Sequence, residues 1–137
     1  VLTPFTNHPP NQEINMSKFA NTDVLDGSLT VVATATRMVA VSGQPASYAA
    51  ADAGKLAEAT LTGADFTLAA GDISGRKVTV AAKSGLSVIT AGTADHVALL
   101  DPVLSKLLYV TTCPAQALVG GGTVSIASWA VEVGAPS

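Results

Sequence analysis

A chain of 137 residues with a formal net charge of −3 is long enough to form one domain with a buried core. Only 12% of its residues are charged, against about 25% in an average soluble domain, and its Lys and Arg residues are scattered, which argues against a nucleic-acid partner. No segment approaches the roughly 20 apolar residues of a membrane-spanning helix, and the single cysteine, Cys113, excludes an intrachain disulfide and a cysteine metal cluster.

The first 22 residues are predicted to form an extended arm ahead of a β-rich domain over residues 23–137. Pro4, Pro9 and Pro10 interrupt any regular element, and the segment lacks the basic-then-apolar pattern of a signal peptide. Because such a segment has no core of its own, we expect the arm to dock on a neighbouring subunit. Alternatively, Met16 is the translation start, and residues 1–15 are then an upstream extension.

Residues 24–37 carry mixed signals and are predicted to form either a short helix or a strand. Leu25, Leu29 and Val32 recur at helical spacing behind Asp23, which could cap the helix. The many β-branched residues of the segment favour a strand instead.

A strand is expected at residues 38–42, followed by a turn at Gly43-Gln44-Pro45. Residues 46–53 resemble one or two helical turns, with Ser47 as the N-cap and Gly54 at the end.

Beyond Gly54 the chain is predicted to be β throughout. The expected strands are short apolar runs between turn residues, over residues 55–62, 65–69, 76–82, 86–90, 96–101, 106–112 and 123–133. The pair 96–101 and 106–112 is expected to be antiparallel. Because the apolar runs are nearly continuous, both are expected to be central strands covered on both faces. A shift of alternation near Ala127-Ser128 predicts a bulge.

Six or seven strands at this spacing predict a mainly β fold, an antiparallel β-sandwich or barrel-like single domain with one or two short helices.

The strongest candidate for catalysis is Asp95-His96 with Cys113. A Cys–His nucleophile needs the two side chains within hydrogen-bond reach and a third group that orients the base. Cysteine is, however, among the residue types most often buried. We therefore favour a buried thiol and a strand-edge histidine, and predict no catalytic residue.

Four carboxylates, Asp65, Asp72, Asp95 and Asp101, lie at strand ends or turns. Calcium needs six to eight converging oxygens, but the chain has no closely spaced acidic loop. Because Asp is favoured at turns for backbone reasons alone, these residues are expected to have structural roles.

Other chemistry-bearing residues also favour structural interpretations. His8 and His96 are too far apart for a local metal-binding pair, and Gly120-Gly121-Gly122 lacks the Lys and Ser/Thr of a phosphate-binding loop. Arg76-Lys77 is expected at a solvated strand edge, and Trp129 is expected to anchor the core rather than to stack on a ligand. We expect no enzyme, no cofactor and no metal.

Several segments of the sequence resemble those of a family of small structural proteins encoded by tailed bacteriophages. They are GDISGRKVTVAAKSGLSV, GTADHVALLD, KLLYVTTCPAQALVGGGTVSIASWAVEV and the terminal GAPS, preceded by LDGSL and ATRMVAVSGQPASYAAA. The resemblance covers the chain from about residue 18 to the C-terminus. Residues 1–15 lie outside it, and residues 28–36 are richer in β-branched residues than the helix-like version typical of the family.

The resemblance implies a virion structural protein made in the host bacterial cytoplasm. We expect a capsid decoration (cement) protein that binds the assembled head and bridges capsid subunits. Its partners would be the major capsid protein and other copies of itself, as a homo-oligomer on the capsid surface. One alternative is a tail or head-to-tail connector component. Another is a host-surface or glycan-binding module, which would need an exposed aromatic platform such as Tyr109 beside Trp129.

Overall fold

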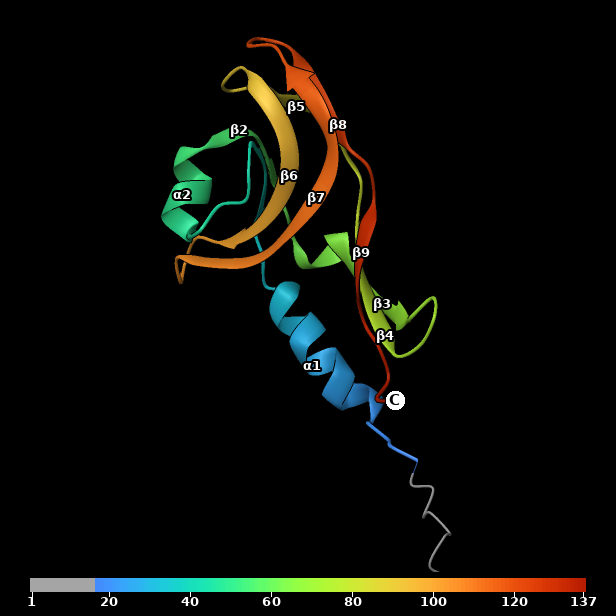
Figure 1. The fold of residues 1–137 in the computed structure, drawn as a ribbon. Helices are drawn as coiled ribbons and strands as arrows, with labels where there is room; N and C mark the ends of the chain where they lie inside the picture. The colour runs from blue at the N-terminus through green and yellow to red at the C-terminus, as the bar shows by residue number, and fades with distance from the viewer. Residues whose placement is uncertain (1–16) are drawn as a thin grey trace, which may run out of the picture.

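The computed structural model describes residues 17–137, so residues 1–16 of the arm predicted over residues 1–22 lie outside the described residues. This part of the chain is mainly β, with nine strands in three antiparallel sheets and two short α-helices, in a sandwich-like arrangement (Figure 1). The predicted fold class is confirmed. The strands outnumber the six or seven expected, partly because residues 123–133 form two strands rather than one.

Of the two structures predicted for residues 24–37, the helix is the one that forms over most of the segment, as α1 (Thr22–Val32). Asn21, not Asp23, is the N-cap, because its side-chain oxygen accepts a hydrogen bond from the Asp23 N–H at 2.8 Å. Leu29 and Val32 are buried on the face that meets the sheets. Burying this face outweighs the few tenths of a kcal/mol per residue by which β-branched side chains disfavour a helix.

The largest sheet has the strand order β2-β1-β6-β7. Its strands are β1 (Arg37–Val41), β2 (Lys55–Thr60), β6 (Gly92–Asp101) and β7 (Lys106–Leu118). Helix α2 (Tyr48–Ala53) covers one face, and Ser47 caps it as predicted, since its hydroxyl accepts the Ala50 N–H at 3.1 Å. Gly54 ends this helix.

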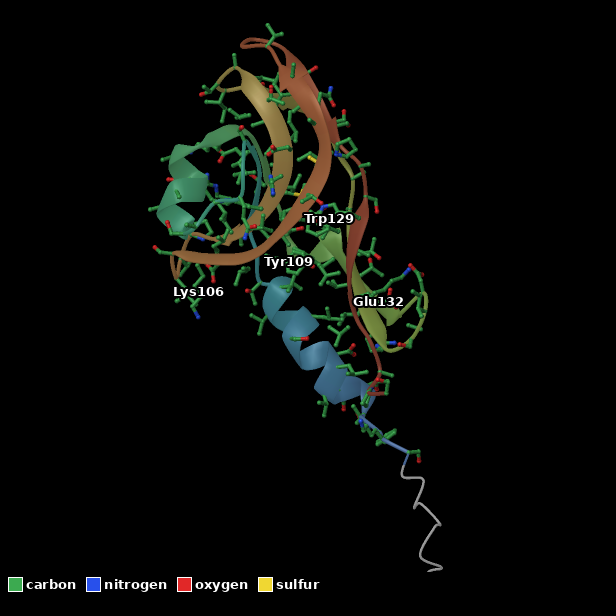
Figure 2. All side chains as sticks on the ribbon, in the orientation of Figure 1. Lys106, Tyr109, Trp129 and Glu132 are labelled. Atoms are coloured by element: carbon green, nitrogen blue, oxygen red, sulfur yellow. The ribbon has the colours of Figure 1, made fainter. Side chains whose placement is uncertain are left out.

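The prediction that residues 96–101 and 106–112 are both central strands is correct only for the first of the two. Strand β6 lies between β1 and β7 and is buried along its second half. Strand β7 is the edge strand and is half exposed (Figures 1 and 2). His96 is expected at a strand edge. Because it lies in β6, which has a neighbouring strand on each side, it lies inside the sheet opposite Thr112 instead.

The two smaller sheets have the orders β3-β4-β9 and β5-β8. Their strands are β3 (Phe66–Ala70), β4 (Arg76–Val80), β5 (Lys83–Ser87), β8 (Thr123–Ile126) and β9 (Trp129–Val133), and the short helix η1 (Gly63–Asp65) precedes β3. The predicted bulge at Ala127-Ser128 is instead the point where the chain leaves one sheet and enters another.

Two further expectations in this region are corrected. The strand expected at residues 86–90 lies at 83–87, and Val88 makes only an isolated bridge to Ala57. Arg76 and Lys77 lie in the central strand β4 and not at an edge, and each has an acidic partner. The inward orientation predicted for Val78 and Val80, by contrast, is confirmed.

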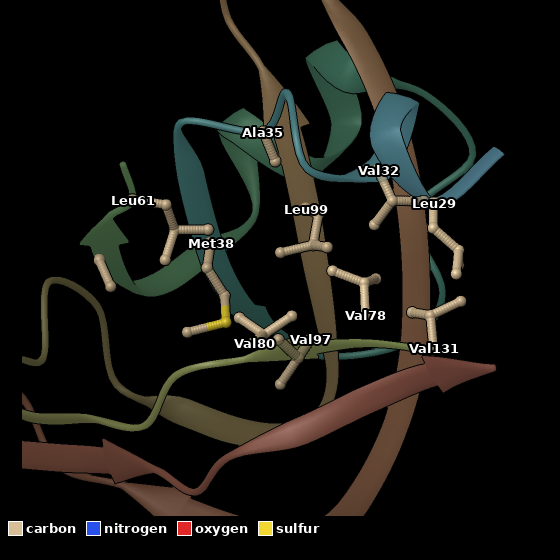
Figure 3. Close-up of a cluster of buried hydrophobic side chains, with 11 residues drawn as sticks. Leu29, Val32, Ala35, Met38, Leu61, Val78, Val80, Val97, Leu99 and Val131 are labelled. Atoms are coloured by element: carbon tan, nitrogen blue, oxygen red, sulfur yellow. The ribbon is translucent and has the colours of Figure 1, made fainter. Parts of the chain in front are cut away.

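One hydrophobic cluster joins α1 to the four- and three-stranded sheets (Figure 3). Its buried members are Leu29, Val32, Ala35, Met38, Ala59, Leu61, Val78, Val80, Val97, Leu99 and Val131. Because these side chains come from α1, β1, β2, β4, β6, β9 and the segments between them, the cluster connects the beginning, middle and end of the chain.

Candidate functional site

The structure pairs Asp95 with His96, and among the described residues Cys113 makes no hydrogen bond to either, although the Asp95 charge lies near enough to act on the thiol. The Asp95 Oδ1 lies 2.7 Å from His96 Nδ1 and accepts the Gly43 N–H at 2.7 Å. His96 lies opposite Thr112, so the next residue, Cys113, points to the other face of the sheet. Cys113 accordingly packs against the main hydrophobic cluster.

The electrostatics of these residues oppose nucleophilic catalysis by Cys113. Burial raises the pKa of the Cys113 thiol, and the negative charge of Asp95 acts in the same direction. Activated cysteines have lowered pKa values instead. The hydrogen bonds from His96 and from the Gly43 N–H hold the pKa of Asp95 below its usual range, so this carboxylate is structural and charged near neutral pH.

The other predicted turn carboxylates each have local partners. Asp65 accepts the Thr62 N–H at 2.8 Å and pairs with Lys83 at 2.9 Å. Asp72 pairs with Lys77, and Asp101 accepts the N–H groups of the turn that follows it. Within residues 17–137, no group of three His, Cys, Asp or Glu side chains converges to hold a metal ion. His8 lies outside the described residues.

A cavity of about 330 Å³ lies between β7 and the β8–β9 segment and is here called the β7–β9 cavity. Its walls carry no charged side chain and include Thr111, Cys113, Ser125, Ala127, Ser128 and Trp129. Because most of these side chains are small, they leave the space between the strands unfilled. The volume is at the lower end of the range of roughly 300–1,000 Å³ typical of binding pockets.

Trp129 lies at the boundary between this cavity and the core. Its ring stacks on Tyr109 of β7, with centroids 6.0 Å apart and an interplanar angle of 30° (Figure 2). Trp129 also packs against the main cluster, as expected of a core anchor, whereas Tyr109 is 38% exposed. The two rings therefore cover one another rather than forming a flat platform for a sugar.

The Trp129 Nε1–H is buried and has no hydrogen-bond acceptor. A buried donor without a partner costs about 1–3 kcal/mol. Sequence reasoning missed both this group and the cavity, although the small residues on both sides of Trp129 were a signal for unfilled space.

A second candidate surface is the outer face of α1, here called the α1 face and defined by Val24, Gly27, Ser28 and Val31. Val24 is 70% exposed and Val31 is 56% exposed. Phe19, just before the helix, is 85% exposed. Apolar side chains left in water in this way often mark contact sites for other proteins.

No protein-family model, curated protein or solved structure matches this chain. Within residues 17–137, neither helix has the length and hydropathy needed to cross a bilayer.

Proposed function

We propose that this chain is a structural protein of a tailed-bacteriophage virion that decorates the assembled head and bridges neighbouring capsid subunits. Its partners are the major capsid protein and other copies of itself, and its location is the capsid surface. The resemblance of residues 18–137 to small phage structural proteins supports this proposal. It assigns the chain no enzymatic activity, cofactor or metal.

The α1 face is the observation that carries the proposal. Val24 and Val31 are seven residues apart, two helical turns, and lie on the same side of α1, with Gly27 and Ser28 between them. A helix face in contact with water is usually rich in charged side chains. Asp23 is the only exposed charged residue in α1, so this face suits close contact with another protein.

The helix that carries this face is held in place at both ends. Asp26 pairs with Arg76 of β4 at 2.8 Å, and Leu29 and Val32 are buried in the core. Just before the helix, the Lys18 Nζ donates to the Ser137 carbonyl oxygen at 2.6 Å. A surface fixed in this way loses little conformational entropy on binding, which favours a stable contact.

The number of copies per virion tests the proposal. Virions whose genome encodes this chain would be purified, and the chain quantified against the major capsid protein by mass spectrometry. A head decoration protein is expected at a fixed, simple ratio to the major capsid protein. A few dozen copies or fewer would instead favour the tail or the head-to-tail connector, and absence from the virion would contradict both.

Rebinding to stripped heads tests the surface. The double variant Val24→Lys/Val31→Lys should bind such heads about tenfold more weakly or worse, because it places two charges in an apolar contact. The matched control, Val103→Lys/Val119→Lys, makes the same change at two exposed valines in turns beside β7 and should bind normally. Equal affinity for the two variants would exclude the α1 face as the contact.

A further inference from the structure

The β7–β9 cavity has an apolar floor and a polar opening. Four of its lining residues are apolar and buried, and these form the floor: Ala40, Ala94, Val97 and Leu118. Other lining residues are polar and exposed, among them Gln116, Ser125 and Ser128. The floor belongs to β1, β6 and the end of β7, whereas the exposed residues belong to β7 and the β8–β9 segment (Figure 1). The cavity is therefore open to a small molecule from solvent.

Water is a poor occupant of the floor. A buried water molecule typically makes about three hydrogen bonds, and the apolar floor side chains offer none. Water is loosely held at such a surface, so an apolar molecule that displaces it gains affinity. The floor therefore favours an apolar ligand over water.

The volume of the cavity sets the size of the ligand. An apolar cavity of about 150 Å³ is large enough to hold benzene. The β7–β9 cavity, at about 330 Å³, has roughly twice that volume. A ligand of about ten non-hydrogen atoms, such as two fused rings with one substituent, therefore fits.

The walls also restrict the charge of the ligand. None of the lining residues is charged. Burial raises the pKa of the Cys113 thiol, so this group is neutral near neutral pH as well. An ionised ligand would lose its water without gaining a partner of opposite charge. The cavity therefore favours an uncharged ligand.

Trp129 indicates which polar group the ligand carries. This residue lines the cavity, and its buried Nε1–H has no acceptor among the described residues. The indole N–H is a donor only, so its partner must be an acceptor. A carbonyl oxygen on the ligand would supply one and remove the cost of the unpaired donor.

We propose that the β7–β9 cavity binds a small uncharged molecule of about ten non-hydrogen atoms. Its ring system lies against the floor, and one carbonyl oxygen accepts the Trp129 Nε1–H. The site belongs to the isolated chain, so it is independent of the proposed decoration function. Indanone, an uncharged fused-ring ketone of this size, is a suitable probe, and indane is the same ring system without the oxygen.

Titration of the full chain with indanone, followed by NMR, tests the proposal. The chain has one tryptophan, so its indole N–H gives a single resonance that reports on the cavity. Indanone should shift this resonance saturably and bind about fivefold more tightly than indane, because only indanone offers an acceptor. Indane carboxylate, which is charged, should bind at least about tenfold more weakly than indanone.

Substitutions in the cavity wall provide the complementary test. Ala127→Leu places a larger side chain in the wall, and Ala130→Leu is the matched control at an exposed alanine of β9 outside the lining. Ala127→Leu should weaken indanone binding about tenfold, whereas Ala130→Leu should bind normally. Trp129→Phe keeps a ring but removes the donor, so indanone and indane should then bind equally, as read from the ligand resonances.

Each outcome decides for or against the site. Saturable binding with a preference for indanone that Trp129→Phe abolishes supports it. No saturable binding of indanone overturns it, and so do equal affinities of the wild type for indanone and indane. Equal weakening by Ala127→Leu and Ala130→Leu would contradict the location of the ligand. The decoration function is tested separately, by the copy number in virions.

Discussion

The Asp65 carboxylate makes two stabilising contacts in the fold. One carboxylate oxygen accepts the Thr62 N–H and the other pairs with Lys83. The Thr62 N–H and then the Lys83 ammonium hold the pKa of Asp65 below its usual range. A lowered folded-state pKa contributes stability that is present above the unfolded pKa, about 3.9, and is lost as the pH falls through the folded value.

Asp65→Asn should therefore lower the melting temperature at pH 7, and its difference from the wild type should shrink as the pH falls below about 4. The asparagine oxygen can still accept the Thr62 N–H, so the change isolates the charge. Thermal unfolding followed by circular dichroism between pH 7 and pH 2 measures this effect. The control Asp72→Asn removes a more exposed ion pair with Lys77 and should change stability little. A difference for Asp65→Asn that stays constant with pH would contradict the assigned role.

The Cys113 thiol should react slowly in the folded protein. Burial and the nearby Asp95 charge raise its pKa, so less of it is thiolate at pH 7 than for an ordinary cysteine. Reaction with Ellman's reagent should be about tenfold slower in the native chain than in the urea-unfolded chain. The native rate should keep rising above the pH at which a free thiol is fully ionised. A native rate equal to the unfolded rate would indicate an activated cysteine and reopen the question of catalysis.

At the scale of elements, α1 has one face that stabilises the fold and one that does not. Leu29 is 1% exposed, so Leu29→Ala should lower the free energy of unfolding by about 2–5 kcal/mol. Val24→Ala, on the α1 face, should change it by less than about 0.5 kcal/mol. Urea titrations give both values. Similar losses for the two variants would mean that the exposed face is also packed.

Local patterns in the sequence predicted most of the strands but not which strands lie next to each other in a sheet. Alternating or nearly continuous apolar runs were enough to predict β1, β4 and β6, because each run reflects burial of one or two faces of the strand. The run at residues 106–112 looked like that of a central strand. Its apolar side chains do pack, Leu107 against the α2 side and Leu108 against the main cluster. Whether a strand has one neighbour or two depends on contacts far away in sequence.

In the candidate site, too, local sequence is informative only for contacts between residues close together in the chain. The Asp95–His96 contact joins two neighbours in sequence, but alternation along a strand does not predict it. That Cys113 faces the opposite side depends on the β6–β7 register, which shifts between Ala94 and His96. The β7–β9 cavity is formed by segments that meet only in the folded chain, so no local pattern could predict it.

The whole molecule should unfold as one unit, because one cluster joins α1, the four-stranded sheet and the three-stranded sheet. Trp129, the single tryptophan, reports on β9, while far-UV circular dichroism reports on all strands. The two urea transitions should coincide. Leu99→Ala, in β6, should move both midpoints equally, with a loss of about 2–5 kcal/mol. If only the circular dichroism transition moved, the four-stranded and three-stranded sheets would unfold independently of each other, although the shared cluster predicts that they do not.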